Sequence, residues 1–359
     1  MQIVAGLSLR NLKPRVWDPR SQHHLPDLRA VMVSYAEFDE FPAKRRQAME
    51  LGLRAFLGVP EGVRIYLDNG SFSFARRGRQ VDVAAYEEFV TVARPDWWPV
   101  PQDFIPAPSM SRAEVEECFR RTMAMNRRAA CRPEIPVIHI GPLLGDYLAA
   151  LEADERLAAR ADLGLGGIVP NLLRAPKALP YREILDGLRV ARERLAGKRI
   201  HLFGVGGIAT LHLAALLGID SADSSGWRNR AARGIVQLPG HGDRSVANLG
   251  SWRGREPSLE EWAELERCRC PACRTYGPEG LRQTKIAGFC NRATHNLWTL
   301  LEEGKLIRAH LRAGSYVDWY AGHIRNSIYR PLIEHVVDGC RQSPITEVPG
   351  SPSGRGDRR

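Results

Sequence analysis

The stretch RIHLFGVGGIATLHLAALLGIDSADSS, residues 199–225, decides the fold class. It opens with a short apolar run that ends in glycines (199–207) and continues through a segment with helical apolar spacing (208–217). It closes with a second short run, GIDSADSS (218–225). This order predicts a strand, a helix and a second strand parallel to the first.

The same alternation continues along most of the chain. Helical spacing predicts helices at roughly 43–57, 82–93, 111–130, 144–160 and 180–196. We expect further strands at RAVMVSY (29–35), VRIYLDNG (63–70), DWWPVPQDF (96–104), IPVIHIG (135–141), DLGLGGIV (162–169) and GIVQLPG (234–240). Seven or eight such units in about 230 residues fit an α/β fold of the (β/α)8 TIM barrel type. A doubly wound sheet remains the alternative, because periodicity cannot separate the two.

Polar residues and glycines gather at the carboxyl ends of the predicted strands. In a barrel these ends meet at one mouth, where active sites are built, so their placement favours the barrel. The two glycine-rich turns, LGLGG and FGVGG, lack the GxGxxG spacing of a dinucleotide site. The strand-end residues are Asp68, Asp103, His139, Gly164 to Gly167, Gly204 to Gly207, Asp220 and Asp223.

The composition excludes several classes of protein. The 359 residues are 44% hydrophobic, which excludes global disorder. No apolar run approaches the roughly 18 residues of a membrane helix, and residues 1–15 lack the apolar core of a secretory signal. We therefore expect a cytoplasmic protein. The net charge of +10 fits a phosphate-bearing partner or an ordinary basic surface.

Three of the seven cysteines fall within six positions, as Cys268-x-Cys270-x2-Cys273. An odd cysteine count without a secretory signal argues against a disulfide framework. Three close thiolates and one histidine are a standard set for structural zinc. We expect His295, 22 positions later, as the fourth ligand, with Cys290 as its competitor.

Two of the strand-end carboxylates stand out. A lone strand-end Asp is most often an Asx-turn or a helix cap, but several carboxylates converging in one mouth suggest catalysis. Asp68 is followed by Asn-Gly and then by Phe72. Asp223 is followed by two serines that could orient it and by Trp227 as apolar cover.

The strand–helix rhythm also suggests how the chain is divided. We expect residues 1–240 to form the barrel core and 241–295 a zinc-binding subdomain. Residues 296–340 should supply the closing helices, and residues 341–359 a disordered tail.

Taken in order, these motifs resemble the tRNA-guanine transglycosylase superfamily over roughly residues 29–320. The most specific part is Cys-x-Cys-x2-Cys followed by His-Asn-Leu at 295–297. The resemblance implies a zinc-containing (β/α)8 barrel that exchanges a guanine in a polynucleotide for a 7-deazaguanine, through a covalent Asp–sugar intermediate. It also implies that the zinc ligands are Cys268, Cys270, Cys273 and His295.

The resemblance assigns roles to the residues of the mouth. Asp223 matches the nucleophile, and Asp68 matches the residue that handles protons. Phe72 and Phe203 match the rings that sandwich the base. The remaining base contacts that it implies are Asp103, Gly166, Gly167, Asn69 and His139.

Several departures favour the branch that modifies bacterial or phage DNA. Asn69-Gly70-Ser71 replaces Ser-Gly-Gly, and Ser224 to Trp227 replaces the segment after the nucleophile in the tRNA enzymes. The base-contacting Gln is also absent, since His139 or Ile140 stands before Gly141. We therefore expect a DNA-guanine transglycosylase that inserts 7-cyano-7-deazaguanine, with accessory DNA-modification proteins as conceivable partners.

Alternatives remain open at this point. The same chemistry on tRNA is the first, and a non-catalytic nucleic-acid-binding subunit is the second. An unrelated zinc-stabilised barrel with sugar substrates is the third. Arginines that follow two mouth strands would hold phosphates around a flipped nucleotide or simply form a solvated surface. They are Arg76, Arg77, Arg79, Arg228, Arg230 and Arg233.

Overall fold

A computed structural model describes residues 1–169, 178–249, 254–325 and 329–342. Its main sheet has seven strands in the order β3-β2-β1-β7-β6-β5-β4, and the paired neighbours run parallel. The α/β class is therefore confirmed. The strands are β1 (Gln2–Gly6), β2 (Ala30–Ser34), β3 (Arg64–Asp68), β4 (Val137–His139), β5 (Asp162–Gly166), β6 (Arg199–Leu202) and β7 (Ser221–Ser224).

An extended segment, residues 96–100, lies between the two outer strands of this sheet. The Leu67 N–H on β3 donates to the Trp97 carbonyl (2.8 Å), and the Ile135 N–H before β4 donates to the Trp98 carbonyl (2.9 Å). The hydrogen bonding thus runs around a ring, as the predicted barrel requires. Because Pro99 and Pro101 have no N–H to donate, this segment forms only isolated bridges.

Two strands differ from the prediction. β1 was not expected, because a long irregular segment follows it and hides the strand–helix alternation. It pairs with both β2 and β7. Because β7 is paired with β1 on one side and β6 on the other, the run 234–240, expected as a barrel strand, cannot pair with β7. It forms β8 (Ile235–Leu238), antiparallel to β9 (Gly242–Ser245), in a separate two-stranded sheet.

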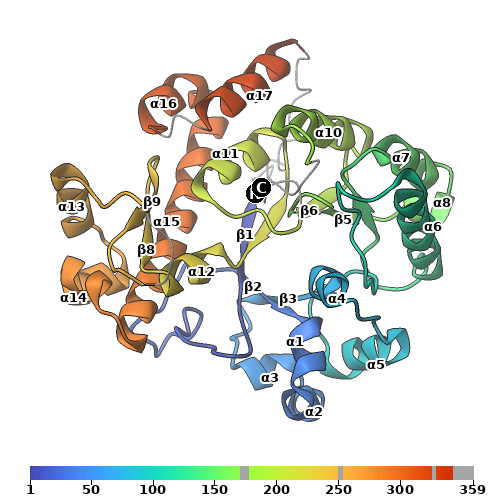
Figure 1. The fold of residues 1–359 in the computed structure, drawn as a ribbon, viewed down its shortest axis with the longest axis horizontal. Helices are drawn as coiled ribbons and strands as arrows, with labels where there is room; N and C mark the ends of the chain where they lie inside the picture. The colour runs from blue at the N-terminus through green and yellow to red at the C-terminus, as the bar shows by residue number, and fades with distance from the viewer. Residues whose placement is uncertain (170–177, 250–253, 326–328, 343–359) are drawn as a thin grey trace, which may run out of the picture.

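Helices surround the strands (Figure 1). Each stretch predicted from apolar spacing is helical, but 43–57 is divided at Gly52, and 144–160 at Ala153 and Asp154, into two helices each. Polar residues cap several of these helices; Ser111 and Glu114, for example, form a capping box at the start of α6. The helices are α1 (Tyr35–Glu40), α2 (Pro42–Leu51), α3 (Leu53–Leu57), α4 (Ser71–Arg77), α5 (Val83–Ala93), α6 (Arg112–Arg128), α7 (Leu144–Glu152), α8 (Glu155–Ala158), α10 (Tyr181–Arg194), α11 (Ile208–Leu216), α12 (Gly226–Ala232), α13 (Leu259–Glu266), α14 (Pro271–Arg282), α15 (Ile286–Arg312), α16 (Tyr316–His323) and α17 (Arg330–Gln342).

The segment with the cysteines forms a small unit beside the barrel. β8, β9, α13 and α14 gather at the left of Figure 1, and α15 runs from them back along the ring. α15 contacts β8 and α14 as well as α11, α12 and β1. The boundary expected between residues 295 and 296 falls inside α15, so one helix belongs to both parts. The expected tail lies, from residue 343 onward, outside the described residues.

The core has two layers. Inside the ring lie Val4, Ala30, Met32, Tyr66, Trp97 and Ile135, with Phe203 packed against them. A much larger apolar cluster lies between the strands and the surrounding helices. None of the described helices combines the length and the apolar character that a membrane span requires.

Candidate active site

A cavity of about 550 Å³ opens at the carboxyl ends of the barrel strands, a volume within the usual range for small-molecule sites. Ser34 on β2 and Gln102 after the extended segment also line it, although the sequence did not single them out. The predicted catalytic and base-binding residues meet here with one exception: Asp68, Asn69, Phe72, His139, Gly166, Gly167, Phe203 and Asp223 line the cavity.

Asp223 lies on β7 and faces this cavity. The Gly204 N–H donates to its Oδ1 (2.7 Å), and its side chain keeps 15% exposure. Oδ2 has no hydrogen-bond partner among the contacts of the described residues. The carboxylate is thus held by one oxygen and open at the other.

Behind Asp223 lies a buried histidine that the sequence did not single out. Nε2 of His201 is 3.5 Å from Oδ1 of Asp223, and Nδ1 is 2.9 Å from the Ser221 hydroxyl. The ring packs among Tyr66, Trp97 and Phe203. One signal was available, because His201 and Phe203 are two positions apart and side chains alternate along a strand.

Asp68 closes β3 and keeps only a small accessible surface onto the cavity. The Ser34 hydroxyl (2.8 Å) and the Gly70 N–H (3.0 Å) both donate to its Oδ2. Burial, together with the nearby charge of Asp223, raises the pKa of Asp68 to about 6. A carboxyl group with such a pKa can both donate and accept a proton near neutral pH.

His139 on β4 lines the cavity as a neutral imidazole. It is buried, and neither ring nitrogen has a hydrogen-bond partner in the described residues. Burial lowers its pKa to about 3. Gly166 makes room for the ring, because a Cβ there would lie 3.0 Å from Nδ1. Gly167 has φ +79°, and a Cβ there would lie 2.7 Å from the Ile140 carbonyl oxygen, so neither position accepts a side chain easily.

The predicted aromatic pair and Asn69 have different surroundings. Phe72 is 40% exposed, and Phe203 packs against the interior cluster of the barrel. Asn69 is buried, its amide donates to the Val100 carbonyl (2.8 Å), and its oxygen accepts from the Ser71 N–H (3.0 Å). Asn69 therefore ties the end of β3 to the extended segment, which indicates a structural role.

Two of the predicted carboxylates lie elsewhere. Asp103 does not line the cavity; it pairs with Arg121 of α6. Asp220 precedes β7 rather than ending it, so it lies at the opposite end of the barrel. There it accepts from the Ile200 N–H (2.8 Å) and pairs with Arg192 (3.4 Å). Of the four carboxylates expected to share the mouth, only Asp68 and Asp223 line the cavity, where Glu37 of α1, which the sequence did not single out, joins them.

The predicted phosphate-binding arginines also divide. Arg76 is exposed, whereas Arg77 pairs with Glu40 (2.9 Å) and Arg230 with Asp243 (2.8 Å). Arg228 is 7% exposed, and its guanidinium donates to the Lys13 and Asn11 carbonyls. We therefore withdraw Arg228 as a phosphate contact.

The three clustered cysteines and His295 converge beside the barrel. Nδ1 of His295 lies 3.4, 3.8 and 3.5 Å from the Sγ atoms of Cys268, Cys270 and Cys273. Nε2 is 2.9 Å from the Gln237 carbonyl oxygen on β8, which orients the ring with Nδ1 toward the sulfurs. The four ligand atoms lie within 4.8 Å of one another, and Cys290 is not among them.

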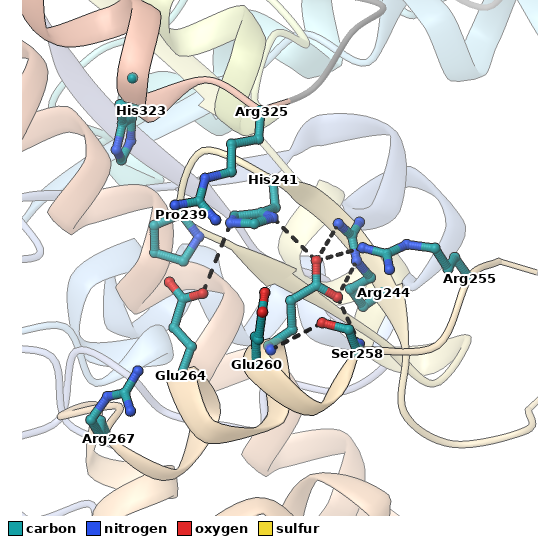
Figure 2. A pocket seen from close by; sticks show the side chains of 12 residues that line it. Pro239, His241, Arg244, Arg255, Ser258, Glu260, Glu264, Arg267, His323 and Arg325 are labelled. Atoms are coloured by element: carbon teal, nitrogen blue, oxygen red, sulfur yellow. Dashed lines mark hydrogen bonds and ion pairs between the residues drawn. The ribbon is translucent and has the colours of Figure 1, made fainter.

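A second hollow, of about 630 Å³, lies between the β8–β9 turn, α13 and the end of α16 (Figure 2). Glu261 is one of the residues that line it, and its carboxylate accepts from Arg244 (2.7 Å), Arg255 (2.5 Å) and the Ser258 N–H (2.9 Å). Burial alone would raise the pKa of Glu261, but these donors hold it at about 2. None of the predicted catalytic or metal-ligating residues lines this hollow.

The geometry defines a class: a parallel α/β barrel with Asp68 and Asp223 in its mouth and a Cys3His cluster beside it. Comparison with known families narrows this class. The model of the family described as Queuine tRNA-ribosyltransferase matches residues 44–328, and the chain belongs to this family.

Several archaeal proteins named tRNA-guanine(15) transglycosylase are similar to the chain. The Pyrococcus abyssi protein is 29% identical over 320 residues, which are 84% of this chain and 50% of the relative. The Haloferax volcanii protein is 28% identical over 319 residues, 84% of this chain and 57% of the relative. The chain thus spans about half the length of the curated relatives that it matches. These relatives support the superfamily but not its DNA-modifying branch.

Proposed function

We propose that the chain is a base-exchanging transglycosylase, which replaces a guanine in a polynucleotide by a 7-deazaguanine. The observation that carries the proposal is the placement of Asp68 on β3 and Asp223 on β7, where both line one cavity. The two carboxyl groups have different hydrogen-bond partners, namely Ser34 and Gly70 for Asp68 and Gly204 for Asp223. Membership of the family supports the reaction class.

In the first half of the reaction, a carboxylate oxygen of Asp223 attacks C1′ of the target nucleotide. The C1′–N9 bond breaks, its electron pair leaves with guanine, and the base takes a proton from the Asp68 carboxyl group. The sugar is then held as an ester of Asp223, as in retaining glycosidases. The Gly204 N–H, bound to Oδ1, leaves Oδ2 as the attacking oxygen.

In the second half, the incoming 7-deazaguanine gives the proton of its N9 to the Asp68 carboxylate. The freed nitrogen attacks C1′, and the ester bond to Asp223 breaks. Two displacements at one carbon retain the configuration of the sugar. One carboxyl group with a pKa of about 6 can serve both halves.

Transfer RNA is the first candidate for the polynucleotide, because the similar proteins named above are tRNA enzymes by name. DNA is the second candidate. It rests on the departures next to the two carboxylates, at Asn69 to Ser71 and Ser224 to Trp227. In either polymer the base must leave its stack to enter the cavity, between Phe72 and Phe203.

We also propose that Cys268, Cys270, Cys273 and His295 hold a structural zinc ion. Three sulfurs and one imidazole nitrogen fit its tetrahedral preference, and they leave no open position for catalysis. The apolar cluster of this segment is small. The ion would therefore stabilise the fold of the segment by cross-linking the three cysteines to His295 on α15.

The test is incorporation of labelled guanine or 7-cyano-7-deazaguanine into tRNA and into duplex DNA in parallel reactions. Asp223→Ala should abolish both incorporation and the covalent protein–polynucleotide adduct. Asp146→Ala, which removes an exposed carboxylate of α7, should leave both intact. A covalent adduct formed by Asp223→Ala would refute the nucleophile, and incorporation into neither polymer would refute the proposed function.

A further inference from the structure

A second cluster of metal-ligating side chains lies apart from the cysteines. His212 of α11, Glu303 of α15 and His323 of α16 bring their ligand atoms within 4.8 Å of one another. Oε1 of Glu303 is 2.8 Å from Nε2 of His212 and 2.7 Å from Nε2 of His323. The side chains of His212 and Glu303 are fully buried, and that of His323 is 18% exposed.

The buried carboxylate of Glu303 is incompletely satisfied. Both histidines face Oε1, whereas Oε2 has no hydrogen-bond partner among the described residues. Nδ1 of His212 is 2.7 Å from the Tyr316 hydroxyl, so the ring is satisfied as a neutral imidazole that turns Nε2 toward Glu303. A buried, unpaired carboxylate oxygen is costly, and a cation would satisfy it.

The histidine rings are held in place by their neighbours. The Trp319 ring stacks on His212, with ring centroids 5.6 Å apart, and on His323, with centroids 4.4 Å apart. Gly240 packs closely against His323, since a Cβ there would lie 3.4 Å from Nε2. The Tyr316 hydroxyl behind His212 is the kind of partner that orients a metal-ligating histidine.

We propose that His212, Glu303 and His323 form a second metal site, for a divalent first-row transition ion. Two imidazoles and one carboxylate are a donor set that such ions prefer. The ion would take Nε2 of each histidine and the Glu303 carboxylate, and it would hold α11, α15 and α16 together. The site is separate from the thiolate cluster, because Glu303 follows His295 by eight residues, or about 12 Å of helix.

The hollow around Glu261 supplies the solvent side of this site. His323 stands at its edge in Figure 2, and its ring makes no interaction with the other side chains drawn. It is also the one exposed member of the three. An ion would therefore enter past His323 rather than from the cavity that holds Asp68 and Asp223.

The test is a titration of the metal-free full-length chain with Co²⁺ under anaerobic conditions, followed by absorption spectroscopy. Thiolate ligands give Co²⁺ an intense near-ultraviolet charge-transfer band, whereas nitrogen and oxygen ligands give weak visible bands alone. We expect two equivalents to bind, with the thiolate band saturating at one.

Variants show which of the two sites binds each equivalent of Co²⁺. His323→Ala and Glu303→Gln should each bind one equivalent and keep the thiolate band, whereas Cys270→Ser should lose that band and keep the weak visible bands. Glu303→Gln keeps hydrogen-bonding capacity, so it controls for misfolding. A wild-type chain that binds one equivalent in excess Co²⁺, or a His323→Ala variant that still binds two, would overturn the proposal. Neither readout depends on base exchange.

Discussion

His201 and Asp223 lie on neighbouring strands, with Nε2 of the histidine 3.5 Å from Oδ1 of the carboxylate. Nε2 has no hydrogen-bond partner among the described residues, and Nδ1 is fixed by Ser221. The imidazole is therefore aimed at the proposed nucleophile without touching the cavity that receives the base. This placement indicates a positioning residue for Asp223.

Replacing His201 should slow the reaction without weakening base binding. His201 contacts the Asp223 carboxylate and packs beside it without forming a hydrogen bond, so we expect His201→Leu to lower kcat roughly tenfold, or about 1.4 kcal/mol. KM for the incoming base should change little. His201→Gln, which keeps a polar group beside the carboxylate, should keep more activity than His201→Leu. A raised KM with unchanged kcat would instead place His201 in base binding.

Asp68→Asn should stabilise the fold at high pH while abolishing exchange. At about pH 4 the carboxyl group is protonated in the folded chain and about half protonated in the unfolded chain, so its burial costs little. Between about pH 4 and 6 the unfolded chain loses this proton while the folded chain keeps it, because the folded pKa is about 6, and the cost to the folded state reaches its full value above pH 6. The variant should therefore gain up to roughly 2–3 kcal/mol of unfolding free energy at pH 8, and almost none at pH 4.

Denaturant unfolding of both proteins at pH 4 and pH 8 measures this difference. Ser34→Ala is the matched control, because it removes a donor to the Asp68 carboxylate but keeps the acid. An Asp68→Asn gain that is equal at both pH values would show that ionisation of Asp68 is not its cause.

His139 should act in base recognition as a neutral group. The residue lines the cavity, and both ring nitrogens are buried and have no hydrogen-bond partner among the described residues, so a rotation of the ring would turn a nitrogen toward the base. We expect His139→Phe to raise KM for the incoming base about tenfold, the value of one hydrogen bond, with a smaller effect on kcat. Because its pKa is about 3, the KM effect should be constant from pH 5.5 to 8, and a KM effect that varies across this range would contradict it.

Cys270→Ser should lower the zinc content and the stability of the protein first, and its base-exchange activity only as a consequence. Cys270 is buried, and its sulfur accepts the Cys273 N–H (3.2 Å) at the start of α14. We expect elemental analysis to show zinc reduced by about one equivalent, with a lower melting temperature. Cys131→Ser, which changes an exposed cysteine outside the cluster, should alter neither. A metal-free wild-type chain with the same melting temperature as the zinc-loaded chain would contradict a structural zinc.

The barrel was predictable from the sequence where strand and helix alternate, and it was missed where they do not. Residues 199–225 form β6, α11 and β7 as expected. β1 was not predicted, because the long irregular segment that follows it hides the strand–helix alternation. The run 234–240 does form a strand, but local pattern cannot say which sheet a strand joins, and β1 already occupies the edge of β7.

In the site, residues that end a strand were predictable, whereas those that depend on side-chain direction were not. Asp68 and Asp223 were found because polar strand ends face the mouth. Asp220 has the same local signal, yet it begins its strand and points to the other end of the barrel. Arg228 was predicted to contact phosphate or solvent. Only the fold shows that its guanidinium donates to main-chain carbonyls.

The central position of β1 sets the order of events during synthesis. Its ladder to β7 joins Gln2–Gly6 with Ser221–Ser224, more than two hundred residues apart. At roughly 5–20 residues per second, β1 leaves the ribosome tens of seconds before its partner exists. Until then the strand that later carries Asp223 is missing from the ring, so the site cannot form on the nascent chain. A chaperone that shields one open sheet edge would serve this protein through that interval.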